Sequence, residues 1–225
     1  MTVPDLALVR AEPRGLPVDL LLGLLAVVWT AEAMVRLPGA SFVTALVYGG
    51  FAARLLLTTQ VWIPVLLRCW PILPYPLVCL ASSFWSPVPQ ESAVAAVQLL
   101  FTMMMGLYLG STFGLAGIAG LVLTGLGLTM LASAANLGGV LPPAWSWEGG
   151  FLGVYTNKNA LGQRAALLML TLLLFLGQAR GRERGVWLLV AGGTLGLLLL
   201  SRSATSGGVA VGAGGAWRWL SVIRV

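Results

Sequence analysis

The sequence predicts an all-α fold, a polytopic transmembrane bundle of about eight membrane-spanning helices. Of its 225 residues, 58% are hydrophobic and only 9% are charged. Its mean hydropathy is +0.93. A water-soluble domain carries about 25% charged residues, so this composition excludes a soluble enzyme. We expect residues 1–16 to form a cytoplasmic N-terminal tail and residues 17–225 to form the transmembrane helical domain.

Eight apolar runs are bounded by charges, prolines or turn residues, and most approach the roughly 20 residues that a spanning helix needs. They cover residues 17–35, 40–59, 61–84 or 70–84, 93–112, 115–135, 159–177, 186–201 and 206–225. The third run contains several prolines, among them Pro64 and Pro71, and proline breaks or kinks a helix. The first third of that run, with Arg68 and Trp70, is therefore also compatible with the membrane interface.

The charges predict the orientation of the helices. The formal net charge is +6, with 13 cations, but they are scattered singly, so we expect membrane lipid and not nucleic acid as a partner. Arg180, Arg182 and Arg184 share one short loop, which the positive-inside rule places in the cytoplasm. Residues 136–158 then lie outside. The cations on that outer face would be Arg36, Lys158, Arg164 and Arg202.

The composition also limits the available chemistry. The chain has no histidine, which removes the commonest acid/base group and metal ligand near neutral pH. Cys69 and Cys79 are ten positions apart, too far along a helix for a disulfide, so we expect both to be free. The sequence predicts no metal site and no cofactor.

The candidate binding residues are Lys158, Asn159, Arg164 and Arg202. Three of them are cations predicted on the outer face, whereas the cations of membrane proteins usually lie on the cytoplasmic side. Lys158 lies at the start of the predicted helix 159–177, and Arg164 lies about 9 Å deeper. With the helix N-terminus they would form a site for a phosphate or diphosphate. The alternative for Arg164 is to snorkel outward and pair with Glu148 or a lipid phosphate.

Neighbouring residues have simpler interpretations. Trp145, Trp147 and Tyr155 are of the kind that sit at headgroup depth, as an aromatic belt. The hydroxyl residues around Arg202 either cap the next helix or line a polar pocket. These hydroxyl residues are Ser201, Ser203, Thr205 and Ser206.

Three segments stand out together, at Trp85-Ser86, Gly153-Val-Tyr-Thr-Asn-Lys-Asn-Ala-Leu-Gly162 and Leu200-Ser-Arg-Ser-Ala-Thr-Ser206. Their order and spacing resemble the O-antigen ligase and exopolysaccharide polymerase family. The middle motif of that family commonly reads Gly-hydrophobic-aromatic-x-His-Lys-Asn-x-x-Gly. Lys158, Asn159 and Gly162 match it, and Asn157 stands where the family has histidine.

The resemblance implies a bacterial inner-membrane glycosyltransferase. Such enzymes take a glycan from an undecaprenyl diphosphate carrier at the periplasmic face. They transfer it to a growing polysaccharide or to a lipid A core acceptor, without a metal or a nucleotide sugar. Lys158, Arg164 and Arg202 would then hold the diphosphate and stabilise the charge that develops as it leaves.

The sequence also departs from that family. Its members are much longer, and their later helices, where a histidine acid/base is expected, have no counterpart before Val225. We therefore expect an N-terminal portion or truncated member that is inactive by itself. The alternatives are a membrane transporter or flippase of lipid-linked sugars and a non-catalytic membrane subunit.

Overall fold

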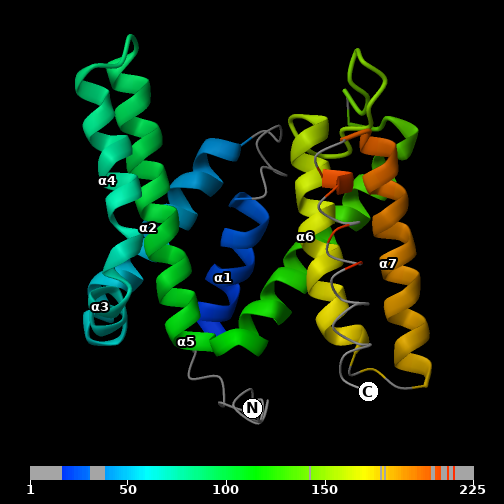
Figure 1. Cartoon of the computed structure of the whole chain (residues 1–225), viewed down its shortest axis with the longest axis horizontal. Coiled ribbons are helices and arrows are strands. Elements are labelled where there is room, and N and C mark those ends of the chain that lie inside the picture. Colours follow the sequence, from blue (N-terminus) through cyan, green and yellow to red (C-terminus); the bar gives the residue numbers. More distant parts are fainter. Residues whose placement is uncertain are drawn as a thin grey trace. The chain divides into compact units, whose positions relative to one another are not determined.

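The chain is helical through most of the part that the structure, a computed structural model, describes (Figure 1). The described residues are 17–30, 39–141, 143–177, 179, 181–203, 206–208, 212 and 215. In chain order the elements are α1 (Pro17–Thr30), α2 (Ala40–Leu57), α3 (Thr59–Arg68), η2 (Trp70–Ile72), α4 (Pro74–Ala81), η3 (Ser82–Phe84), α5 (Pro89–Ala135), η4 (Asn136–Gly138), α6 (Lys158–Leu176) and α7 (Arg182–Ser201). The expected tail, residues 1–16, and most of the last expected run lie outside the described residues.

The predicted break between residues 112 and 115 is confirmed inside α5. Gly114 has φ 62° and ψ −175°, values that interrupt an otherwise helical segment of 47 residues. This region of backbone dihedrals is open to glycine and closed to most other residues. A glycine at this position therefore lets two helical stretches meet at an angle without an intervening loop.

The number of membrane spans differs from the expectation. Among the described residues, α2, α5 and α7 are long and apolar enough to cross a membrane. A fourth span is possible only if the bent pair of α3 and the segment Trp70–Phe84 counts as one. The described α1 has 14 residues, short of the roughly 20 that a span needs. Three or four candidate spans are thus supported, not eight.

The chain divides into two compact units. The first consists of residues 1–26 and 45–118, and the second of residues 27–44 and 119–225. In the first unit, a Cβ added to Gly50 of α2 would lie 2.8 Å from the Leu22 side chain of α1, so the missing side chain permits close helix packing. The buried ring of Phe51 meets that of Tyr108 edge to face, with centroids 6.2 Å apart.

The second unit is built around α6, which packs along α7 and against the last part of α5. Its core combines helix residues with residues of the segment that precedes α6. The fully buried members include Phe151, Tyr155, Leu161, Leu168 and Leu172. Because α6 and α7 are antiparallel neighbours, the first residue of α6 and the last residues of α7 lie at the same end of the unit (Figure 1).

Candidate functional site

A short hairpin, residues 144–152, lies at the end of the second unit where α6 begins. The N–H of Ser146 donates to the carbonyl of Gly150 at 2.8 Å. Trp145 and Phe151 form an isolated antiparallel bridge, and their ring centroids are 5.0 Å apart. These contacts give the segment a defined turn, although proline and glycine keep it from becoming a helix.

The segment around the hairpin is anchored to the helices by backbone and amide hydrogen bonds. The N–H of Phe151 donates to the carbonyl of Leu200 in α7 at 2.9 Å. The buried Asn136 side chain donates to the carbonyls of Leu141 at 3.0 Å and Gly153 at 2.7 Å. An unpaired buried amide would be costly, so Asn136 fixes both ends of the loop. Sequence reasoning missed it, although an asparagine at a helix end is a recognised loop anchor.

The residues just before α6 are packed against α5. Gly153 has φ +61°, and a Cβ there would lie 2.5 Å from the Ser133 hydroxyl oxygen. Tyr155 is fully buried and donates its hydroxyl hydrogen to Thr129 Oγ1 at 2.6 Å. Burial raises the pKa of Tyr155 to about 12. The expectation that Tyr155 belongs to an interfacial aromatic belt is therefore wrong, whereas Trp147 at the hairpin tip is 94% exposed.

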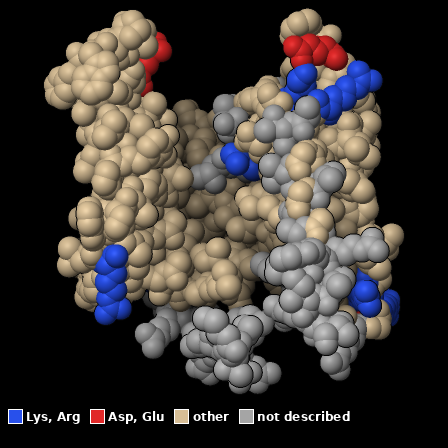
Figure 2. Space-filling model, in the orientation of Figure 1, with Lys and Arg blue, Asp and Glu red and all other residues tan. Residues whose placement is uncertain are grey.

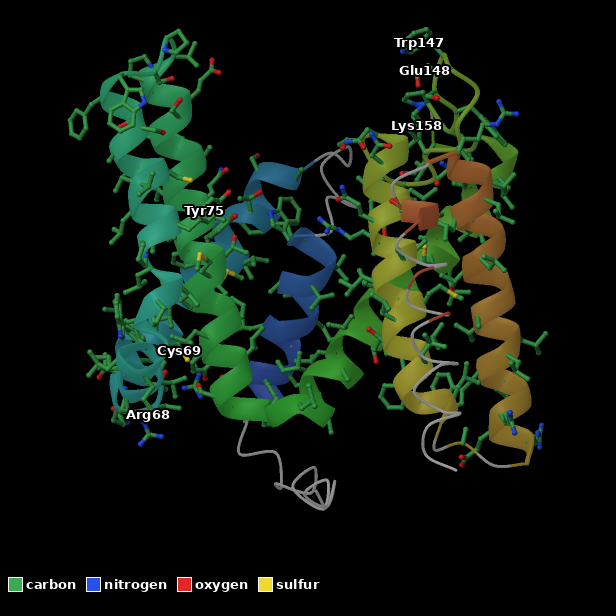
Figure 3. All side chains as sticks on the ribbon, viewed as in Figure 1. Arg68, Cys69, Tyr75, Trp147, Glu148 and Lys158 are labelled. Carbon is green, nitrogen blue, oxygen red and sulfur yellow. The ribbon has the colours of Figure 1, made fainter. Side chains whose placement is uncertain are left out.

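Lys158 is the first residue of α6, as predicted. Asn157 caps the helix, and its side-chain oxygen accepts a hydrogen bond from the N–H of Ala160 at 2.7 Å. The Lys158 ammonium forms an ion pair with Glu148 of the hairpin (Figure 3). A Cβ on Gly150 would lie 2.8 Å from Lys158 Cδ, so the lysine stem lies directly against this turn.

Arg202 lies beside the same turn. It ends α7 with φ 51° and ψ 32°, and its N–H donates to the carbonyl of Leu199 at 3.1 Å. A Cβ built on Gly149 would lie 3.3 Å from an Arg202 guanidinium nitrogen. The side chains of Lys158 and Arg202 thus lie next to adjacent glycines of one hairpin turn. Figure 2 shows the resulting cluster of basic and acidic atoms at this end of the molecule.

The other two predicted binding residues occupy different positions. Asn159 is exposed beside Lys158, and Arg164 is half-buried about 9 Å further along α6. Glu148 pairs with Lys158, and the alternative for Arg164, pairing with Glu148 or with a lipid phosphate, stays a prediction. The positive charge of Arg164 lowers the pKa of the buried Tyr155 and so partly offsets the increase that burial causes.

The middle and third sequence motifs meet in the structure. A Cβ on Gly162 of α6 would lie 2.7 Å from Ser203 Cβ, 2.9 Å from Ser206 Oγ and 3.1 Å from Ser201 Oγ. These three serines are buried, and the hydroxyls of Ser203 and Ser206 are 2.9 Å apart. They pack on the glycine and bond locally, and Thr205 lies outside the described residues.

The first motif belongs to the other compact unit. Trp85 is 70% exposed. The Ser86 hydroxyl accepts a hydrogen bond from the N–H of Val88 at 3.1 Å and lies 2.6 Å from the Ser92 hydroxyl. These bonds join the turn before α5 to the first turn of that helix.

A second polar cluster, in the first unit, was not predicted. Asp19 of α1 is buried and accepts hydrogen bonds from Arg54 of α2 and from the hydroxyl of Tyr108 at 2.7 Å. A carboxylate within an apolar helix was the signal that could have revealed it, because such a group needs a partner. Sequence alone does not identify that partner, since Arg54 and Tyr108 are 35 and 89 positions away.

Among the described residues, no group of three or more cysteine and acidic side chains is placed to hold a metal ion. No protein-family model, no curated protein and no solved structure matches the chain. The class of protein therefore rests on the structure itself. The apolar helices indicate a helical membrane protein, in which a hairpin brings two cations together at one end of α6 and α7.

Proposed function

We propose that this chain is an O-antigen ligase-like or exopolysaccharide polymerase-like protein of the bacterial inner membrane, or a portion of one. Its role would be to hold an undecaprenyl diphosphate-linked glycan at the periplasmic face during transfer to a polysaccharide or lipid A core acceptor. The proposal concerns the donor site, because the chain contains no histidine that could act as a base toward the acceptor.

The observation that carries the proposal is the convergence of Lys158 and Arg202 on one turn. The two residues are 44 positions apart, at the start of α6 and just after α7, yet their side chains lie next to the adjacent residues Gly150 and Gly149. The packing of Gly162 on Ser203 supports it further, since two motifs that resemble one family meet at one place. Asn159 is exposed beside Lys158 at the start of α6, and in this proposal Arg164 acts from a half-buried position about 9 Å further along the helix.

The chemistry of the cluster suits a diphosphate. Arginine offers a planar set of donors that matches phosphate oxygens, and lysine adds a compact charge. The N–H groups at the start of α6 favour an anion as well. When the glycosidic bond to the carrier breaks, negative charge grows on the diphosphate, so cations held in place lower the barrier. The Glu148 carboxylate already lies against Lys158, and a diphosphate would replace it.

An apolar groove in the same unit is suited to part of the lipid carrier. It has a volume of about 530 Å³ and is formed by the last part of α5 with α6 and α7. Its walls include Leu123, Met130, Leu168, Trp187 and Leu197. An isoprenoid chain is apolar and branched, so a groove of leucine, methionine and tryptophan side chains would bind it through dispersion and exclusion of polar groups.

The proposal is tested by binding of undecaprenyl diphosphate to the protein in lipid nanodiscs, measured by native mass spectrometry. Lys158→Gln and Arg202→Gln remove one charge each, and we expect each to weaken binding about tenfold, the effect of one charge-assisted contact worth about 1.4 kcal/mol. Glutamine keeps a Cβ and a long side chain, so the backbone strain at position 202 is unchanged.

The matched control is Arg184→Gln, an exposed arginine near the opposite end of α7, about 27 Å from Arg202 along the helix. It should bind like the wild type. If all three variants bind equally, the donor site is refuted. If binding is confirmed but glycan transfer is absent with every acceptor, a transporter or a non-catalytic subunit becomes the better description.

A further inference from the structure

The axis of helix α3 (Thr59–Arg68) is nearly perpendicular to that of the segment Trp70–Phe84 that follows it. Ten residues give it a length of about 15 Å, and it is bent by 77° from the segment Trp70–Phe84. Projected on the axis of that segment, α3 advances only about 3 Å. It therefore adds almost nothing to a membrane crossing in which Trp70–Phe84 takes part.

The described part of the chain covers this helix only in part. None of its residues is buried, and several apolar side chains are exposed, with Leu67 at 69% and Trp70, just beyond the helix, at 63%. Exposed to water, such an apolar surface would promote aggregation. In the headgroup region of a bilayer, apolar side chains reach the acyl chains while the polar groups stay hydrated.

Two side chains at the turn that leads into α3 donate hydrogen bonds to carbonyls at the end of α2. Thr58 Oγ1 donates to the carbonyl of Arg54 at 2.6 Å, and Trp62 Nε1 donates to the carbonyl of Leu55 at 2.8 Å. Both carbonyls belong to the last turn of α2, and that of Arg54 also accepts a hydrogen bond from the N–H of Thr58 at 3.0 Å. Unsatisfied carbonyls are costly near lipid, so the indole of Trp62 suits the end of α2 to a place at the membrane boundary.

The charge pattern identifies the partner. Arg68 is the only charged residue between Arg54 and Glu91. It is exposed at the end of α3, and Figure 3 shows it at the lower extremity of this unit with its side chain directed away from the helices. Trp62 and Trp70 flank it, and tryptophan is enriched at headgroup depth. An isolated exposed cation between two tryptophans fits the phosphate layer of a bilayer.

We propose that α3 is an in-plane interfacial helix that docks on the phospholipid headgroup layer, with Arg68 bound to the phosphates of anionic lipids. α2 and the segment Trp70–Phe84 then enter the membrane from this corner. The proposal is independent of the glycan-carrier site, which lies in the other compact unit.

The two native cysteines provide a direct test in the full chain. Cys69 lies just after α3 and Cys79 in α4, and both are free and half-buried. In single-cysteine variants (Cys79→Ser or Cys69→Ser) a nitroxide label reports depth through its relative accessibility to oxygen and to a polar nickel chelate. In phosphatidylglycerol vesicles we expect Cys69 at headgroup depth and Cys79 about 15 Å deeper.

A nitroxide scan along residues 60–67, in the chain lacking both cysteines, gives the decisive pattern. An in-plane helix gives depths that oscillate with the helical period and show no trend, whereas a helix that crosses the membrane gives a steady change. A steady trend, or full exposure to the polar quencher at every position, would overturn the proposal. Circular dichroism confirms that each labelled variant keeps the helix content of the wild type.

The lipid contact has its own readout. Replacing phosphatidylglycerol with phosphatidylcholine should move the Cys69 label toward water, and Arg68→Gln should produce the same shift in phosphatidylglycerol. Arg184→Gln, a change in the other unit, should leave the label depth unaltered. A label depth that is independent of both the lipid charge and Arg68 would refute the binding of anionic phosphates.

Discussion

Arg54 and Asp19 form a two-point ion pair that joins α2 to α1. The Nε atom of Arg54 donates to Asp19 Oδ1 at 2.6 Å, and Nη2 donates to Oδ2 at 2.9 Å. The Asp19 side chain is 1% exposed and that of Arg54 is 20% exposed. Tyr108 of α5 donates to the same carboxylate, so three segments of the chain share one polar centre.

Asp19→Asn should destabilise the protein strongly, because it leaves the Arg54 cation without its counter-charge. We expect a loss of about 3 kcal/mol in the free energy of unfolding, measured by denaturation in detergent micelles with circular dichroism. The double variant Asp19→Leu and Arg54→Met removes both charges and should lose less than the single change. If the single variant is as stable as the wild type, the pair is not a stabilising link.

Tyr108→Phe tests the third member of the cluster. It removes one hydrogen bond to a buried carboxylate and should cost about 1.5 kcal/mol. Tyr48→Phe is the matched control, because the ring of Tyr48 packs on Phe101 with centroids 5.1 Å apart and keeps that contact when the hydroxyl is lost. Equal stability of the two variants would mean that the Tyr108 hydroxyl contributes nothing to the cluster.

Gly162→Ala should loosen the contact between α6 and the end of α7. The new methyl group would lie 2.7 Å from Ser203 Cβ, which forces the segments apart and costs about 1 to 3 kcal/mol. Gly192→Ala serves as the control, because nothing lies within 4 Å of its Cβ position and alanine favours the helix by about 0.5 to 1 kcal/mol. We expect Gly162→Ala to lower the thermal midpoint and Gly192→Ala to raise it. If both variants shift the midpoint in the same direction, the close approach of Gly162 to Ser203 is contradicted.

Glu148→Gln should strengthen anion binding at the hairpin, because the carboxylate competes with the ligand for Lys158. The Glu148 side chain is 42% exposed, and exposed ion pairs contribute at most about 1 kcal/mol. We therefore expect up to about a fivefold gain in affinity for inorganic pyrophosphate, measured by calorimetry. Glu183→Gln, an exposed carboxylate at the start of α7, should change nothing, and an unchanged affinity in both variants would argue against competition.

The buried Tyr155 predicts a loss of stability at alkaline pH. Its pKa rises from 10.0 to about 12 in the folded protein, so the folded state holds the hydroxyl proton more tightly than the unfolded chain. Its stabilising contribution is complete below pH 10 and is lost as the pH rises toward 12. The free energy of unfolding of Tyr155→Phe should therefore vary less with pH than that of the wild type over this interval. Identical pH profiles would contradict the burial of the hydroxyl.

The local features were predictable because each depends on a few neighbouring residues. The apolar runs predicted the helical fold, Gly114 marks the break in α5, and Lys158 begins α6 as expected. The number of spans was overestimated, because an apolar run shows that a segment is hydrophobic but does not show in which direction its helix axis runs. The corner at Cys69, where α3 and the next segment differ by 77°, is invisible to a hydropathy count.

The sequence by itself determined a membrane-type composition, the helix boundaries near glycine and proline, and a set of unusual cations. Only the tertiary structure decided that Glu148 neutralises Lys158, that Arg202 shares the same turn, and that Asp19 finds Arg54 and Tyr108. The physical reason is the distance along the chain over which each kind of interaction acts. Backbone preference and hydrophobicity act within a few residues, whereas a charge or hydroxyl is paired by whichever distant segment the packing of the helices brings within about 3 Å.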